Sequence, residues 1–100
     1  MSKKAETIFA EKVDKLLRKT FGSDIFVENI QQVGKIGTPD RLICLNGHFV
    51  ALELKTNSGV VAPIQLRKLQ KIAHAGGNAY IVSPANLALV LEELKCIFES

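Results

Sequence analysis

The sequence predicts an α/β fold, a mixed sheet flanked by helices, with the element order α-β-β-β-α-β-α. Three observations predict this class. Apolar residues recur at helical spacing in three segments, and strand-length apolar runs lie between those segments. Asn46-Gly47 marks a two-residue hairpin turn between two such runs. The next helix and strand form a β-α-β crossover, so we expect the last strand to run parallel to its neighbour.

The bounds of the expected elements follow from residues that are typical of helix and strand ends. Gly22 is suited to end the first helix. Pro63 suits the first position of the second helix, where its missing N–H costs nothing, and Gly76-Gly77 ends that helix. Ser83-Pro84 is expected to begin the last helix. The predicted helices span residues 4–19, 63–75 and 86–98, and the predicted strands span residues 24–32, 41–45, 48–55 and 79–83.

The predicted hairpin places two carboxylates opposite each other. A two-residue turn at Asn46-Gly47 is of type I′, because both central residues must take positive φ. That turn fixes the strand register, so Asp40 lies directly opposite Glu53 on one face of the sheet. Side chains alternate along a strand, and Lys55 therefore shares the face of Glu53.

Opposed carboxylates repel each other, and a divalent cation between them relieves the repulsion. Oxygen ligands suit Mg²⁺ or Mn²⁺. A lysine one step along the strand can hold a water molecule or stabilise a developing negative charge. Asp40, Glu53 and Lys55 therefore fit a site for phosphodiester hydrolysis. The alternative interpretation is an ordinary hairpin whose solvated acids are neutralised by Lys55.

Two further polar residues are expected near this end of the sheet. At about 100° per residue, Glu6 falls close to the centre of the apolar stripe of the first helix. It could lie over the sheet as a third acid, or it could serve the helix dipole from the first turn. Helix geometry does not separate these alternatives. Gln65 lies in the first turn of the second helix and borders the buried stripe. The residue pattern alone favours a first-turn polar residue with no functional role over a site residue.

The order of these residues resembles a known nuclease signature. Pro39-Asp40 followed by Glu53-Leu54-Lys55 is similar to the PD-(D/E)XK motif. A longer string resembles the VRR-NUC family within that superfamily, and it comprises Gly37-Thr38-Pro39-Asp40, Glu53-Leu54-Lys55-Thr56, Gly59 and Gln65. The resemblance extends from about Glu6 to Ser83. It implies a PD-(D/E)XK restriction-endonuclease-like core, whose element order agrees with the order expected from the residues.

The resemblance also implies the chemistry of a metal-dependent nuclease. Asp40, Glu53 and the backbone carbonyl of Leu54 would hold Mg²⁺ or Mn²⁺, and Glu6 would bind the ion directly or through water. Lys55 would position the attacking water and stabilise charge at phosphorus. The family's glutamine would orient the lysine, a water or the phosphate. The candidate catalytic residues are therefore Asp40, Glu53, Lys55, Gln65 and Glu6.

The expected substrate is DNA, because stand-alone members of this family resemble Holliday-junction resolvases. We expect a branched or flapped substrate and a homodimer that offers one site to each of two strands. Candidate phosphate contacts are Lys35, in a glycine-punctuated loop, and Arg67, Lys68 and Lys71 on the second helix. Two alternatives remain open at this point: a non-catalytic DNA-binding or interaction module with a nuclease fold, and the cleavage subunit of a larger nuclease or replication assembly.

Both faces of the hairpin are apolar, so we expect both to be covered, by helices on each side or by a partner subunit on one. Cys44 and Cys96 lie far apart and match no zinc spacing, so we expect them to be buried free thiols.

Composition and charge restrict the class of protein. The 100 residues are 47% hydrophobic, which suits one small domain with a packed core. The resemblance implies that this domain, over residues 1–100, is a nuclease domain. No apolar run approaches the roughly 18 residues needed to cross a membrane. The first residues do not resemble a signal peptide, so we expect a cytoplasmic protein. A net charge of +3 permits nucleic-acid binding without requiring it.

Overall fold

A computed structural model describes residues 5–30, 39–56 and 61–100 of the chain. The expected element order, α-β-β-β-α-β-α, is confirmed. A short 3₁₀ turn at Gly22–Asp24 follows the first helix. The helices are α1 (Ala5–Phe21), α2 (Pro63–His74) and α3 (Leu87–Phe98), and the strands are β1 (Ile25–Asn29), β2 (Arg41–Leu45), β3 (His48–Leu54) and β4 (Asn78–Val82).

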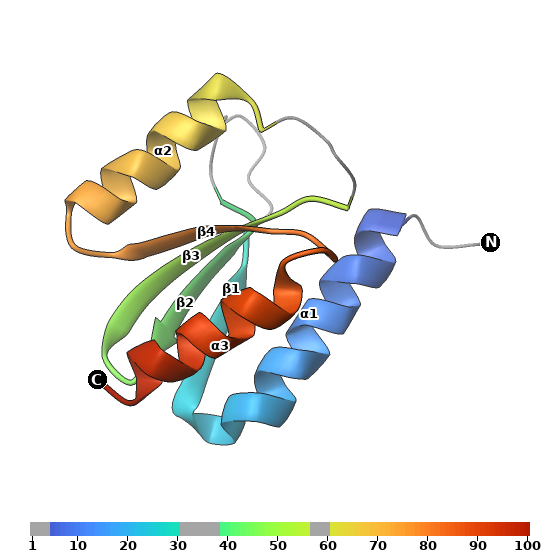
Figure 1. The fold of residues 1–100 in the computed structure, drawn as a ribbon, viewed down its shortest axis with the longest axis vertical. Helices are drawn as coiled ribbons and strands as arrows, with labels where there is room; N and C mark the ends of the chain where they lie inside the picture. The colour runs from blue at the N-terminus through green and yellow to red at the C-terminus, as the bar shows by residue number, and fades with distance from the viewer. Residues whose placement is uncertain (1–4, 31–38, 57–60) are drawn as a thin grey trace.

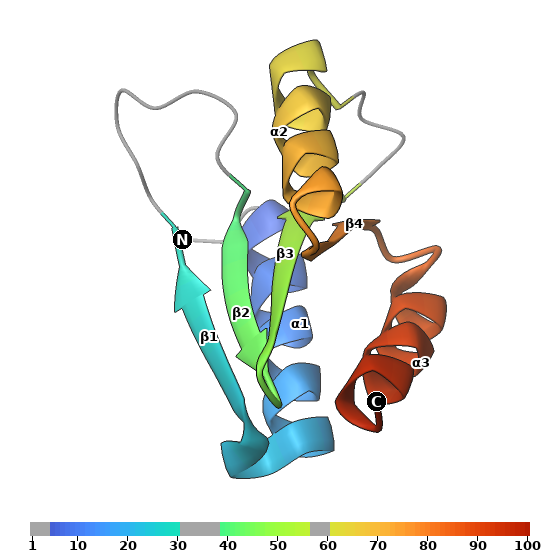
Figure 2. The ribbon, with the colours of Figure 1, turned by 90° about the vertical axis from the view of Figure 1, so that its left-hand side faces the viewer.

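The described strands form one mixed sheet in the order β1-β2-β3-β4. The first three strands are antiparallel, and β4 runs parallel to β3, as the crossover predicts. Helices α1 and α3 lie together on one face of the sheet, and α2 lies on the other (Figures 1 and 2). The fold class predicted from the sequence is thus confirmed.

The β2–β3 hairpin has the predicted turn and register. Asn46 and Gly47 have φ values of 49° and 82°, as a type I′ turn requires. The paired residues run from Leu45 opposite His48 to Arg41 opposite Leu52. One further step along this ladder places Asp40 opposite Glu53.

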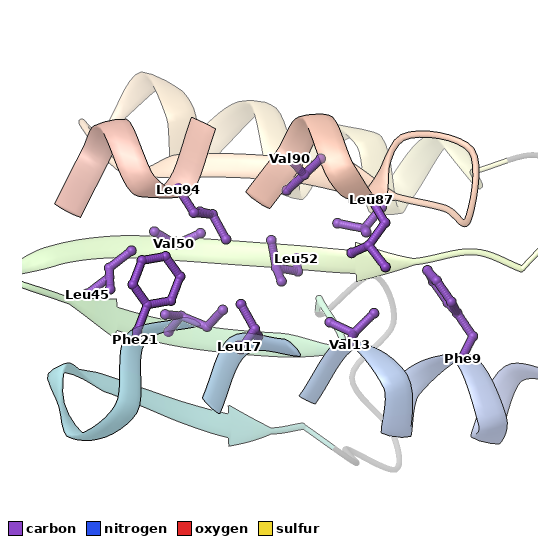
Figure 3. Packing of buried hydrophobic residues seen from close by; sticks show 12 residues of the cluster. Phe9, Val13, Leu17, Phe21, Leu45, Val50, Leu52, Leu87, Val90 and Leu94 are labelled. Carbon is purple, nitrogen blue, oxygen red and sulfur yellow. The ribbon is translucent and has the colours of Figure 1, made fainter. Parts of the chain in front are cut away.

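The core lies between the sheet and the two helices α1 and α3. One stripe of α1 supplies Phe9, Val13, Leu17 and Phe21, which point toward β3 and α3 in Figure 3. Phe9 lies near the end of β3 and Phe21 near its beginning, so the first turn of α1 lies near the strand end that carries Glu53. The other members of the core cluster are Ile43, Leu45, Val50, Leu52, Val82, Leu87, Val90 and Leu94.

The described residues cover the opposite face of the sheet only in part, so the chain's own helices do not supply the whole of the expected cover. Cover by a partner subunit stays a prediction. Phe26, Cys44 and Phe49 are neighbours in register across β1, β2 and β3. Phe26 is 62% exposed and Phe49 46% exposed. The cause is topological, since α2 connects β3 to β4 and lies over those strands rather than over β1 (Figure 2).

Both cysteines are free, but the expectation that they are buried is wrong. Cys44 lies in the uncovered row on β2. Cys96 lies outside the buried stripe of α3, which consists of Leu87, Val90 and Leu94.

Some element ends differ from those expected. The last helix begins at Leu87, and Ser83 is not its N-cap. Asn86 forms the preceding turn instead: its Oδ1 accepts a hydrogen bond from the Ser83 N–H at 2.7 Å, and its Nδ2 donates to the Ile81 carbonyl at 2.8 Å. None of the helices in the described segments combines the length and the apolar character that crossing a bilayer requires.

Candidate active site

Asp40 and Glu53 meet where the β2–β3 hairpin reaches its open end. The Leu54 N–H donates a hydrogen bond to Asp40 Oδ2 at 2.8 Å, so the carboxylate of Asp40 reaches across to β3. The Asp40 carbonyl accepts a hydrogen bond from the Ile30 N–H at 3.0 Å. Glu53 is only 2% exposed, which is unusual for an ionisable side chain. The predicted juxtaposition of the two acids is therefore present, and one of them is buried.

Gln65 joins the first turn of α2 to this pair of acids. Its Nε2 donates a hydrogen bond to Glu53 Oε2 at 2.9 Å. Its Oε1 accepts one from the Ala62 N–H at 3.0 Å, which satisfies a free donor at the helix N-terminus. Gln65 thus fixes the start of α2 and one oxygen of Glu53 at the same time.

The two oxygens of Glu53 have different surroundings. Oε2 accepts from Gln65 and lies 3.6 Å from Lys55 Nζ. Oε1 is buried and has no hydrogen-bond partner among the described residues. A buried carboxylate oxygen without a partner is costly, and a bound cation or a proton would remove that cost.

The pKa of Glu53 is raised from 4.5 to about 7, chiefly by burial and next by the negative charge of Asp40. The ammonium group of Lys55 opposes this rise and lowers the pKa in part. Near neutral pH the Glu53 carboxyl is therefore close to its titration point in the metal-free protein.

A pocket of about 550 Å³ opens over these groups. Asp40, Glu53, Lys55 and Gln65 line it together with Glu6 from α1. Glu6 is exposed and forms part of the pocket wall. Across the described segments, no group of three or more His, Cys, Asp or Glu side chains is close enough to hold a metal ion, so Glu6 is not brought into a three-acid cluster with the other two acids.

The structure describes three of the four candidate phosphate contacts. Arg67 and Lys71 are exposed on α2, and Lys68 is half-buried. Other residues of the sequence pattern lie outside the described residues, namely Lys35, Gly37, Thr38 and Gly59.

One charged pair at the site was not predicted from the sequence. Arg41 pairs with Asp14 of α1 through Nε to Oδ1 at 3.0 Å and Nη2 to Oδ2 at 3.1 Å. Both residues line the same pocket. Arg41 lies on the same strand face as Ile43 and Leu45, where an apolar residue is expected. Its charge at that position was the one sign in the sequence of a buried ion pair.

Two known structures share the fold of this chain. A structure described as "VRR_NUC domain" superposes with a TM-score of 0.68 at 24% sequence identity, and covers 90% of this chain and 97% of that one. A second, described as "VRR_NUC domain protein", superposes with a TM-score of 0.60 at 15% identity, and covers 93% and 88%. No protein-family model matches the sequence. No curated protein sequence matches it.

The mixed sheet with helices on both faces is shared with these two structures. The chain therefore has the fold of VRR_NUC domains, over nearly its whole length. The resemblance suggested by the order of the motif residues is confirmed at the level of the fold.

The raised pKa of Glu53 predicts how the stability of the metal-free protein depends on pH. Because the folded pKa of about 7 lies above 4.5, the folded state binds more protons between these values, and stability falls as pH rises through that window. The loss should reach as much as about 3 kcal/mol. Thermal unfolding in a chelating buffer between pH 5 and pH 8 measures it. Glu53→Gln should remove this part of the pH dependence.

The exposed Glu92 provides a matched control, and Glu92→Gln should keep the wild-type pH profile. An unchanged profile in Glu53→Gln would show that Glu53 does not titrate in this window.

Proposed function

We propose that this protein is a metal-dependent endonuclease that hydrolyses DNA phosphodiester bonds. The observation that carries the proposal is the buried Glu53 opposite Asp40, in a nuclease fold, with Lys55 and Gln65 on the same carboxylate oxygen. Burying a carboxylate beside another one costs stability. Such arrangements concentrate at functional sites, so the cost favours a catalytic role over a structural one.

The chemistry of the donor set fits a hard divalent cation. Asp40, Glu53 and the Leu54 carbonyl would hold Mg²⁺ or Mn²⁺, which prefer oxygen ligands. The unpartnered Glu53 Oε1 is a ready ligand atom. Glu6, on the pocket wall, would act through a water molecule. When bound, the cation polarises the scissile phosphate and lowers the pKa of a water molecule.

The side chains around the acids have separate tasks in this proposal. Gln65 keeps Glu53 Oε2 occupied, which leaves Oε1 for the cation. Lys55 Nζ, at 3.6 Å from Oε2, holds the attacking water and stabilises negative charge at phosphorus. Arg67, Lys68 and Lys71 of α2 contact phosphates away from the scissile bond.

The proposed substrate is branched DNA, a Holliday junction or a flap, bound inside the cell by a homodimer of one-domain chains. The support for a dimer is the row of Phe26, Cys44 and Phe49, which leaves apolar and aromatic surface open on the sheet. Surface of this composition is typical of protein interfaces. A two-fold dimer would carry two sites, one for each of two strands.

Cleavage of a labelled four-way junction and of the matching linear duplex, with Mg²⁺ or Mn²⁺, tests the activity. We expect cuts in the junction only, and Lys55→Ala should slow them by roughly 100-fold or more, because it removes the group that holds water and stabilises charge. Lys95→Ala, at an exposed pair with Glu92 on α3, is the matched control and should cut at the wild-type rate.

Undiminished cleavage by Lys55→Ala would contradict the assignment of Lys55. Cuts in both substrates would keep the nuclease and reject the junction preference. Binding of the junction without any metal-dependent cut would favour a non-catalytic module or the subunit of a larger assembly.

The homodimer is tested by light scattering on the purified protein. Phe26→Glu should convert a dimer to a monomer, because it places a charge in the uncovered apolar row. Leu89→Glu is the control, since Leu89 is 64% exposed on α3, on the opposite side of the sheet, and should leave the dimer intact. A monomeric wild type, or a dimeric Phe26→Glu variant, would reject this interface.

A further inference from the structure

We propose that the Asp14–Arg41 pair is a positioning device for the metal site, because it holds the backbone of Asp40 in the place where its carboxylate faces Glu53. This inference rests on the proposed function. It assigns a role in that site to two residues that lie outside the nuclease signature.

The pair has the geometry of a rigid contact. Arg41 Nε and Nη2 reach the two oxygens of Asp14 at 3.0 and 3.1 Å. Two parallel bonds of this kind fix the plane of the guanidinium group. Arg41 is 8% exposed, so water screens the contact little.

The third nitrogen of the guanidinium group makes the connection to the site. Arg41 Nη1 donates a hydrogen bond to the Asp40 carbonyl at 3.0 Å. The Ile30 N–H donates to the same carbonyl at 3.0 Å. The backbone of Asp40 is thus held from two sides, while its side chain accepts from the Leu54 N–H at 2.8 Å. A change at Arg41 therefore acts on the orientation of the Asp40 carboxylate.

Stability alone does not account for an arginine at this position. Ile43 and Leu45 lie on the same face of β2 and are 2% and 0% exposed. Replacing a buried ion pair by apolar residues of similar volume is often neutral or stabilising. An apolar side chain could fill the space, but it could not hold the Asp40 carbonyl. Lysine could keep the charge, but it lacks the planar set of donors.

The pair also fixes α1 against the end of β2. Asp14 lies eight residues after Glu6, about 12 Å along the helix axis. Both residues line the pocket over the acids. The same ion pair therefore fixes two positions: that of the Asp40 backbone at the end of β2, and that of α1, which forms one wall of the pocket.

Two substitutions separate positioning from support of the fold. Arg41→Lys keeps the charge, and Arg41→Met fills the space without donors. The first readout is amide hydrogen exchange at Leu54 in the metal-free protein, compared with Lys55, whose N–H donates to the Val82 carbonyl at 2.8 Å instead of to Asp40. The second readout is the affinity for Mn²⁺ by calorimetry, with thermal unfolding measured in parallel.

Both variants should speed exchange at Leu54 relative to Lys55 and should weaken Mn²⁺ binding by roughly ten-fold or more, as changes to residues that support metal ligands commonly do. Arg41→Met also leaves Asp14 without its partner and should lower the unfolding temperature, so its Mn²⁺ affinity is compared with that of a variant destabilised away from the site. Leu94→Val, on the buried face of α3, is the control: it should lower the unfolding temperature and leave Mn²⁺ affinity unchanged.

Wild-type exchange at Leu54 and wild-type Mn²⁺ affinity in Arg41→Met would overturn the inference. A wild-type protein that binds no Mn²⁺ would instead overturn the proposed metal site. The two failures are distinguishable, because exchange at Leu54 is measured without metal.

Discussion

The structure depends on holding two carboxylates face to face at the end of one hairpin. Burial of Glu53 and the negative charge of Asp40 both make Glu53 harder to ionise. The arrangement persists because each carboxylate has a donor: the Leu54 N–H for Asp40 and the Gln65 amide for Glu53. One oxygen of Glu53 is left without a described partner, and that atom is the most direct structural argument for a cation.

The rest of the fold can be understood as support for this pair. The type I′ turn sets the register that places Asp40 opposite Glu53. Gln65, in the first turn of α2, lies at the open end of the hairpin, where its side-chain amide donates to Glu53. The apolar stripe of α1 packs along the sheet and brings the first turn of that helix toward the same end (Figure 3). Asp14 and Arg41 join these elements at the site itself.

Local rules predicted much of this from the sequence. A two-residue Asn-Gly turn has few alternatives, so the hairpin register and the pairing of the acids could be derived. The element order and the parallel last strand followed from periodicity and crossover geometry. Gln65 was expected near the site, but its hydrogen bond to Glu53 joins residues 12 positions apart, and no local pattern predicts it.

What the sequence could not supply depends on contacts between distant segments. Cys44 was expected to be buried because both faces of the hairpin are apolar, but α2 covers only the strands that it connects. Nothing in the sequence favoured Asn86 over Ser83 at the start of α3, because serine and asparagine are both favoured at helix N-caps. The Asp14–Arg41 pair joins residues 27 positions apart, and no local pattern links them. The surroundings of Glu53 likewise include a distant segment, since Gln65 of α2 donates a hydrogen bond to its carboxylate.

The central claim is that Asp40 and Glu53 form one cation site whose metal-free form is electrostatically costly. Titration of the Glu53 carboxyl carbon by NMR, with and without saturating Mg²⁺, tests it most directly. We expect a pKa of about 7 without the ion, and a pKa well below that value with the ion, because bound Mg²⁺ favours the ionised carboxylate. A pKa close to 4.5 that Mg²⁺ does not change would contradict both the burial cost and the metal site.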